Sequence, residues 1–187
     1  MWTDSDKVPE MGLQYQFRKA QKTISRLSPG DRQRLEEICG DIQQAEKRLR
    51  VAAEDALLRC GTVCKGVCCR NIDLDAVLGL PDFVYILTLK KHLADRMAAC
   101  LQNENPFYIA DCIFLENGSG PCIFPNTVMP EVCITTFCTT ETPAEKEIKQ
   151  LKWKFFYLGW FLSTLKIRAF LRYLHGWIKR TDHRVSH

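Results

Sequence analysis

The stretch Cys60-Gly-Thr-Val-Cys64-Lys-Gly-Val-Cys68-Cys69 holds four of the ten cysteines of this 187-residue chain, and its pattern sets the expectation for the middle of the fold. Four more cysteines follow, at Cys112, Cys122, Cys133 and Cys138. Because four thiolates complete one metal site, eight thiols can hold one or two metal centres. The other two, Cys39 and Cys100, lie singly in segments with a helical pattern.

The spacing of the first cluster differs from that of the common metal motifs. Zinc ribbons use C-x2-C pairs and ferredoxins use C-x2-C-x2-C, and this sequence has neither. Cys60, Cys64 and Cys68 form C-x3-C-x3-C, whereas radical S-adenosylmethionine enzymes use C-x3-C-x2-C and need a barrel for which 187 residues leave little room. Thiolates suit both zinc and iron–sulfur clusters, so the spacing leaves the metal open.

The beginning of the chain and its composition predict the compartment. The first six residues, Met1 to Asp6, lack the basic and apolar regions of a secretory signal. We therefore expect a cytoplasmic protein, in which clustered thiols are metal ligands or redox groups more often than disulfides. A hydrophobic content of 46% and a charged content of 26% are typical of one folded domain. Residues 1–11 and 181–187 are expected to be flexible.

Residues 12–59 predict an N-terminal helical hairpin. Apolar residues recur in steps of four and three along the first helix, at Leu13, Phe17, Ala20, Ile24 and Leu27. Ser28 can cap a second helix, with Pro29 at its first position, and a similar stripe then runs from Leu35 to Ala56. Packing of this hairpin on its own domain is the favoured interpretation, and a contact within a dimer is the alternative.

Residues 60–138 predict a small, irregular, cysteine-rich metal-binding module. An apolar stripe within it indicates a helix from Asp82 to about Leu101, with Lys90 as its one polar interruption. Apolar segments on both sides of Asn117-Gly118 indicate a short β-hairpin. No phosphate loop, dinucleotide fingerprint or nucleophile elbow is present in the sequence, so we assign no catalytic residues.

Residues 139–180 predict a long, basic, aromatic helix. From Lys146 to Arg180 there are nine lysines and arginines against one glutamate. The apolar run from Phe155 to Leu162 is eight residues long, and a membrane span needs about 20, so no transmembrane helix is expected. We favour burial of the aromatic side chains against the core. The alternatives are contact with an anionic membrane surface, or with an acidic protein or nucleic acid.

The cysteine pattern resembles that of the YkgJ family, the CxxCxxCC proteins that chelate zinc or iron. The resemblance covers residues 60–138, where all eight family cysteines find a counterpart in order: Cys60, Cys64, Cys68, Cys69, Cys112, Cys122, Cys133 and Cys138. It includes the segments Cys112-Ile-Phe-Leu, Cys122-Ile-Phe and Met129-Pro-Glu-Val-Cys133. Some relatives join this module to a flagellin lysine methylase with an iron–sulfur cluster. The resemblance therefore implies these eight ligands and favours iron–sulfur over zinc.

These observations predict a mainly α fold. An N-terminal helical hairpin and a long C-terminal helix would surround the cysteine-rich module and its β-hairpin. The expected function is a metal-binding protein with a 4Fe-4S-like centre in an electron-transfer or structural role. A zinc-stabilised interaction scaffold and a cluster-dependent, methyltransferase-like enzyme component are the alternatives. A protein partner would bind the basic aromatic helix or the N-terminal hairpin.

Overall fold

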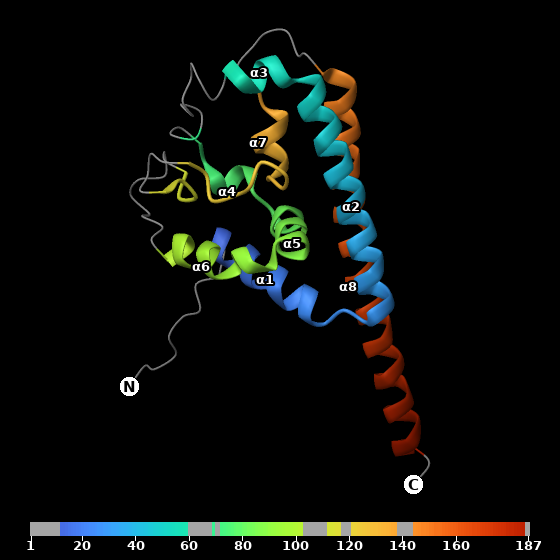
Figure 1. Ribbon diagram of the computed structural model, residues 1–187. Coiled ribbons are helices and arrows are strands. Elements are labelled where there is room, and N and C mark those ends of the chain that lie inside the picture. Colours follow the sequence, from blue (N-terminus) through green and yellow to red (C-terminus); the bar gives the residue numbers. More distant parts are fainter. Residues whose placement is uncertain are drawn as a thin grey trace, which may run out of the picture.

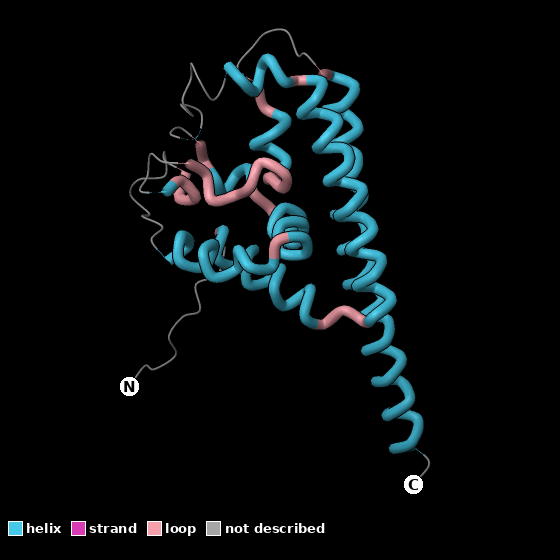
Figure 2. Tube along the Cα trace, in the orientation of Figure 1, coloured by secondary structure: helices cyan, strands magenta, loops and turns pink. Residues whose placement is uncertain are grey.

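The computed structural model describes residues 12–59, 69, 72–102, 112–116, 121–137 and 144–185. Most of these residues are helical, and Figure 2 shows no strand among them, so the predicted mainly α fold is confirmed. The elements follow in the order α1 (Leu13–Ser25), α2 (Pro29–Ala52), α3 (Glu54–Arg59), α4 (Leu74–Val77), α5 (Leu80–Leu89), a 3-10 turn (Lys91–Leu93), α6 (Ala94–Gln102), α7 (Glu131–Thr135) and α8 (Glu145–Val185).

The long helices α2 and α8 lie side by side along one edge of the molecule (Figure 1). Three polar contacts set their register, joining Arg168 to Asp31 (3.2 Å), Arg34 to Tyr157 (3.0 Å) and Lys154 to Asp41 (2.7 Å). Because residue numbers rise along α2 while those of their partners fall along α8, the two helices are antiparallel. The far end of α8 continues beyond the start of α2 and projects from the body (Figure 1).

The predicted long C-terminal helix is thus confirmed, and α8 continues to Val185, five residues past the predicted boundary at residue 180. The favoured interpretation of this helix, burial of its aromatic side chains against the core, is only half right. Phe155, Leu158 and Leu162 are buried, whereas Trp153, Phe156 and Trp160 are exposed. Among the described helices, none is long and apolar enough to cross a membrane.

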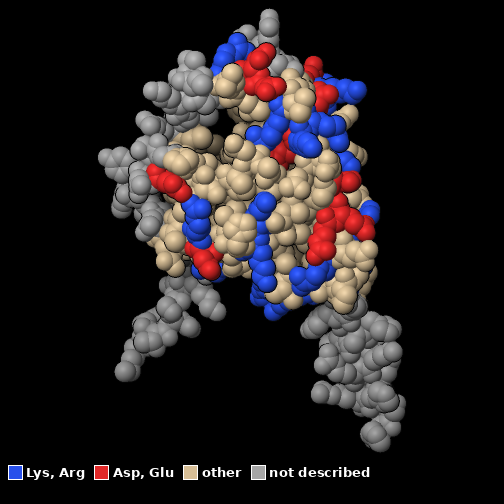
Figure 3. Space-filling view, viewed as in Figure 1, with Lys and Arg blue, Asp and Glu red and all other residues tan. Residues whose placement is uncertain are grey.

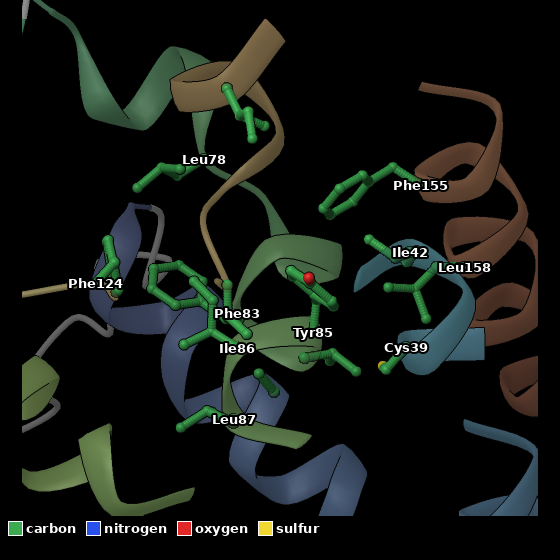
Figure 4. Close-up of a cluster of buried hydrophobic side chains, with 14 of the residues drawn as sticks. Cys39, Ile42, Leu78, Phe83, Tyr85, Ile86, Leu87, Phe124, Phe155 and Leu158 are labelled. Atoms are coloured by element: carbon green, nitrogen blue, oxygen red, sulfur yellow. The ribbon is translucent and has the colours of Figure 1, made fainter. Parts of the chain in front are cut away.

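Helix α5 occupies the centre of the core and packs against α1, α2 and α8. Every side chain from Asp82 to Leu87 is buried. The ring of Phe83 meets Phe17 of α1 edge to face at 5.8 Å, and the ring of Tyr85 meets Phe155 of α8 in the same way at 5.3 Å. Figure 4 shows Tyr85 between the α5 backbone and the side chains of Ile42 and Phe155. Such a helix is apolar all round because it has a neighbour on each side.

The two helices predicted as a hairpin over residues 12–59 have different main packing partners. Helix α1 packs against α5 and α6, whereas α2 packs against α8 and α5. The helix boundary itself is confirmed, because the Ser28 side chain caps α2 by accepting a hydrogen bond from the amide of Asp31 (3.2 Å). Each apolar stripe is buried, but against a helix that is distant in sequence.

The predicted helix from Asp82 to Leu101 is interrupted at Lys90, where α5 ends. A 3-10 turn follows, and α6 leaves in a new direction (Figure 1). The interruption falls at the one polar position of the apolar stripe, so the break keeps the Lys90 ammonium out of the core. The break also lets α6 reach α1, where Gln14 donates to the carbonyl of Leu101 at 2.7 Å.

Candidate metal centre

The eight predicted ligands divide equally between described and undescribed parts of the chain. Cys69, Cys112, Cys122 and Cys133 lie in described segments, and Cys60, Cys64, Cys68 and Cys138 lie outside them. The described four come from three segments, at residue 69, residues 112–116 and residues 121–137, and Cys133 lies on α7, which packs against α8. The amide of Cys112 donates to the carbonyl of Cys69 at 2.7 Å, so the first cluster meets the second through the backbone.

The segments around Cys112 and Cys122 are joined by one isolated antiparallel bridge, between Leu115 and Cys122. Two backbone hydrogen bonds support it, from Glu116 to the Pro121 carbonyl (3.0 Å) and from Ile123 to the Phe114 carbonyl (2.9 Å). In the described residues this pairing does not extend into strands, so the predicted β-hairpin is represented there by this single bridge. The turn residues 117–120 lie outside the described part of the chain.

The bridge brings together two copies of the same tripeptide, Cys-Ile-Phe, at 112–114 and 122–124. In each copy the backbone amide two residues later, that of Phe114 or Phe124, opposes the rise in pKa that burial causes in the cysteine thiol. The two phenylalanine rings contact each other at 4.8 Å and are both buried. Amide donors of this kind stabilise a thiolate and orient it toward a metal.

Two buried carboxylates hold the segment that leads to Cys133. Asp82 accepts hydrogen bonds from the amides of Gly79 (3.0 Å) and Glu131 (2.9 Å). Glu46 accepts from the Tyr85 hydroxyl at 2.7 Å and from the more distant Met129 amide at 3.5 Å. Both carboxylates therefore fix the backbone just before Cys133 and connect it to α2 and α5. Burial raises the pKa of each of them, and these hydrogen bonds oppose the rise.

Burial also dominates the electrostatics of the thiols. It raises the pKa of Cys112 to about 12, against the opposing amide of Phe114, and negative charge on Cys122, Cys69 or Cys100 would raise it further. The pKa of Cys133 is raised by burial and then by its charge interactions with Cys122, Cys112 and Cys69. These mutual effects indicate that the four described cysteines share one region. Because the pKa values of Cys112, Cys122 and Cys133 are raised, binding of a metal to these thiols would release protons.

Cys100 is not among the eight cysteines that the sequence predicted as ligands. It lies on α6, and its charge affects the pKa of both Cys112 and Cys122, so it borders the same region. Burial raises its own pKa, and Arg96 opposes that rise. A lone cysteine in a helical pattern carries no sequence signal for this position, because the proximity depends on the break at Lys90.

Within the described residues, no three cysteine, histidine, aspartate or glutamate side chains are close enough to hold one metal ion. The other four predicted ligands lie outside the described segments. Cys39 belongs elsewhere, because it is fully buried on α2 in the core (Figure 4). Burial raises its pKa to about 12, while a hydrogen bond with Thr88 opposes the rise.

A hollow of about 600 Å³ lies between α8 and the beginnings of α5 and α7. Its lining includes Glu131, Lys152, Trp160 and Lys166, but no cysteine. The hollow is therefore separate from the region where the described thiols gather. Asp82 also lines it, with both of its carboxylate oxygens engaged by backbone amides.

Comparison of the chain with protein-family models, with curated proteins and with solved structures finds no match.

Proposed function

We propose that the protein binds a metal centre through its clustered cysteine thiolates, as a relative of the YkgJ proteins. The observation that carries the proposal is the antiparallel bridge between Leu115 and Cys122, which brings together the two Cys-Ile-Phe segments that begin at Cys112 and Cys122. Cys69 is tied to the first segment by its carbonyl, and Cys133 interacts electrostatically with these three thiols. The ligand set would draw on the eight predicted cysteines: Cys60, Cys64, Cys68, Cys69, Cys112, Cys122, Cys133 and Cys138.

An iron–sulfur centre of the 4Fe-4S type is the favoured occupant, and zinc is the alternative. Amide donors to sulfur and a buried surround are two of the means by which proteins tune the potential of a cluster. Phe114 and Phe124 supply such a surround beside Cys112 and Cys122. We infer an electron-transfer or structural role in the cytoplasm. A zinc-stabilised scaffold would use the same thiols with closed coordination and no redox function.

A cluster-dependent enzyme component, such as part of a methyltransferase, is the less favoured alternative. An enzyme would need a substrate pocket with access to the centre. The described hollow beside α7 is lined by Glu131 and Lys152 and by no thiol, so it gives this alternative no support.

The test is a metal analysis of protein purified without oxygen. Iron and acid-labile sulfide, with a broad absorbance near ~400 nm that dithionite bleaches, are the expected results for a thiolate-bound cluster. A colourless protein that contains about one or two zinc ions per chain would replace the cluster by the zinc scaffold. A protein that binds neither metal after reconstitution would overturn the proposal.

Matched alanine variants locate the centre. Cys112→Ala removes a thiol of the proposed set, and Cys39→Ala removes an equally buried thiol of the helical core. We expect Cys112→Ala to lower the bound metal strongly and Cys39→Ala to leave it unchanged. Circular dichroism of both variants checks that the helices persist. Equal metal content in both would place the centre elsewhere.

A further inference from the structure

Helix α8 has two apolar faces on opposite sides, and only one of them is covered. Phe155, Leu158 and Leu162 face the core, where α8 packs on α2, α5 and α7. The opposite face leaves five large side chains exposed, and we call it the aromatic face: Trp153, Phe156, Trp160, Ile167 and Leu171. Their spacing of three, four, seven and four residues places them on one line along the helix.

The exposed side chains of the aromatic face are large and lie next to one another. Trp153, Phe156 and Trp160 have exposed fractions of 64%, 60% and 61%, and the rings of Trp153 and Phe156 stack at 5.2 Å. From Trp153 to Leu171 the face extends about 27 Å at the helical rise of 1.5 Å per residue. The stacked group of Trp153, Phe156 and Trp160, with Ile167 and Leu171 further along the same line, indicates an interaction site.

Beyond its first turn, α8 itself carries charges of one sign as far as residue 181. No aspartate or glutamate occurs from residue 148 to residue 181, whereas eight lysines and arginines do. Lys154 and Arg168 contact Asp41 and Asp31 of α2, so part of this charge is neutralised within the body. Lys152 and Lys166 lie along the flank of the face and line the hollow beside it, where Glu131 is also present.

The surface of the body differs from this helix. On the side of the molecule seen in Figure 3, lysine and arginine are interspersed with aspartate and glutamate. This face of the body therefore lacks the run of a single charge sign that residues 148–181 carry. Tryptophan and phenylalanine on one helical face, flanked by lysine, are typical of helices that lie in the interface of an anionic bilayer.

We propose that α8 docks the protein on an anionic membrane surface. Trp153, Phe156 and Trp160 would enter the boundary between head groups and acyl chains, while Lys152 and Lys166 contact the lipid phosphates. A second copy of this chain fits less well, because pairing two aromatic faces would bring their like-charged flanks together. Docking depends on the side of α8 that is remote from the core and is independent of the metal centre.

The test is sedimentation of the full-length protein with lipid vesicles. Vesicles of phosphatidylcholine with about 30% phosphatidylserine should bind it, and pure phosphatidylcholine should bind it much less, because the flanking lysines need negative lipid. Binding should weaken when the salt is raised from about 0.1 M to about 0.5 M. Absence of binding to the phosphatidylserine vesicles would overturn the proposal.

Two variants distinguish binding through the aromatic face from non-specific hydrophobic binding. The double change Trp153→Ser and Trp160→Ser should weaken vesicle binding at least about tenfold, because it removes two interfacial anchors. The control Val51→Ser removes an exposed apolar side chain of α2, whose exposed fraction is 71%, and should bind like the unchanged protein. Both sites are exposed, so the fold should persist in each variant.

Three further outcomes bear on the role of the aromatic face. Equal binding by the double variant and the unchanged protein would refute the role of the aromatic face. A dimer in sizing experiments that the double variant abolishes, without vesicle binding, would assign the face to a second copy of this chain. Loss of metal from the protein with vesicle binding intact would affect the proposed function and leave this inference standing.

Discussion

Removal of the Tyr85 hydroxyl is the sharpest probe of the carboxylates that position Cys133. Tyr85 and Glu46 are both fully buried, with a hydrogen bond of 2.7 Å between them. The Tyr85→Phe change keeps the ring and its edge contact with Phe155 but removes one donor to the carboxylate. A buried hydrogen bond to a charged acceptor contributes about 1.5–3 kcal/mol to stability. We therefore expect the change to lower the free energy of unfolding by about 2 kcal/mol.

The effect should depend on pH in a defined direction. Burial raises the pKa of Glu46 above its unfolded value, and the hydrogen bond from Tyr85 opposes the rise. A group with a raised folded pKa contributes stability that is fully present below its unfolded pKa and is lost as the pH rises through the folded pKa. Because Tyr85→Phe raises the folded pKa further, its deficit in stability should be largest at neutral pH and should shrink on acidification.

Urea unfolding followed by circular dichroism measures both effects. The matched control is Tyr157→Phe, which removes an exposed hydroxyl that accepts from Arg34 and should change stability little. A stability of Tyr85→Phe within about 0.5 kcal/mol of the unchanged protein would refute the reasoning, since substitutions that touch no such network fall in that range. A deficit that grows as the pH falls would refute it equally.

Three further results are expected from the same fold. Ser28→Ala removes the cap of α2 and should lower the free energy of unfolding by about 1 kcal/mol in urea titrations. Phe114→Ala empties a buried position beneath the Leu115–Cys122 bridge and should cost about 3–5 kcal/mol, also measured by urea. Removing the metal with a chelator should lower the Tm of the unchanged protein and not that of Cys112→Ala, because only the former would retain a bound centre.

Local patterns predicted the helices well and their partners poorly. The stripes beginning at Leu13 and Leu35 and the cap at Ser28 depend on neighbours within one or two turns, so the sequence is sufficient for them. The packing partner of each apolar stripe depends on residues that are distant in the sequence. The same stripe suits a partner in a hairpin or a distant helix, and α2 lies on α8.

Prediction from the sequence failed where two physical effects compete at one residue. Lys90 ends α5 because a charge in a buried stripe costs more than a broken helix, a balance that periodicity alone does not weigh. The exposed rings of α8 were expected to be buried, because Trp153 and Phe155 look equally apolar in a sequence. The participation of Cys69, Cys112, Cys122 and Cys133 in one metal centre stays a prediction.

The pairing of α2 with α8 has a consequence for the order in which the protein forms on the ribosome. Contacts such as that between Asp31 and Arg168 join residues 137 positions apart, so a large loop must close before they form. Helices α1, α2 and α5 leave the ribosome first, with Ile42 and Tyr85 lacking the cover that Phe155 and Leu158 provide. The nascent chain would therefore carry an open apolar seam until α8 emerges, which makes it a natural client for a chaperone during that interval.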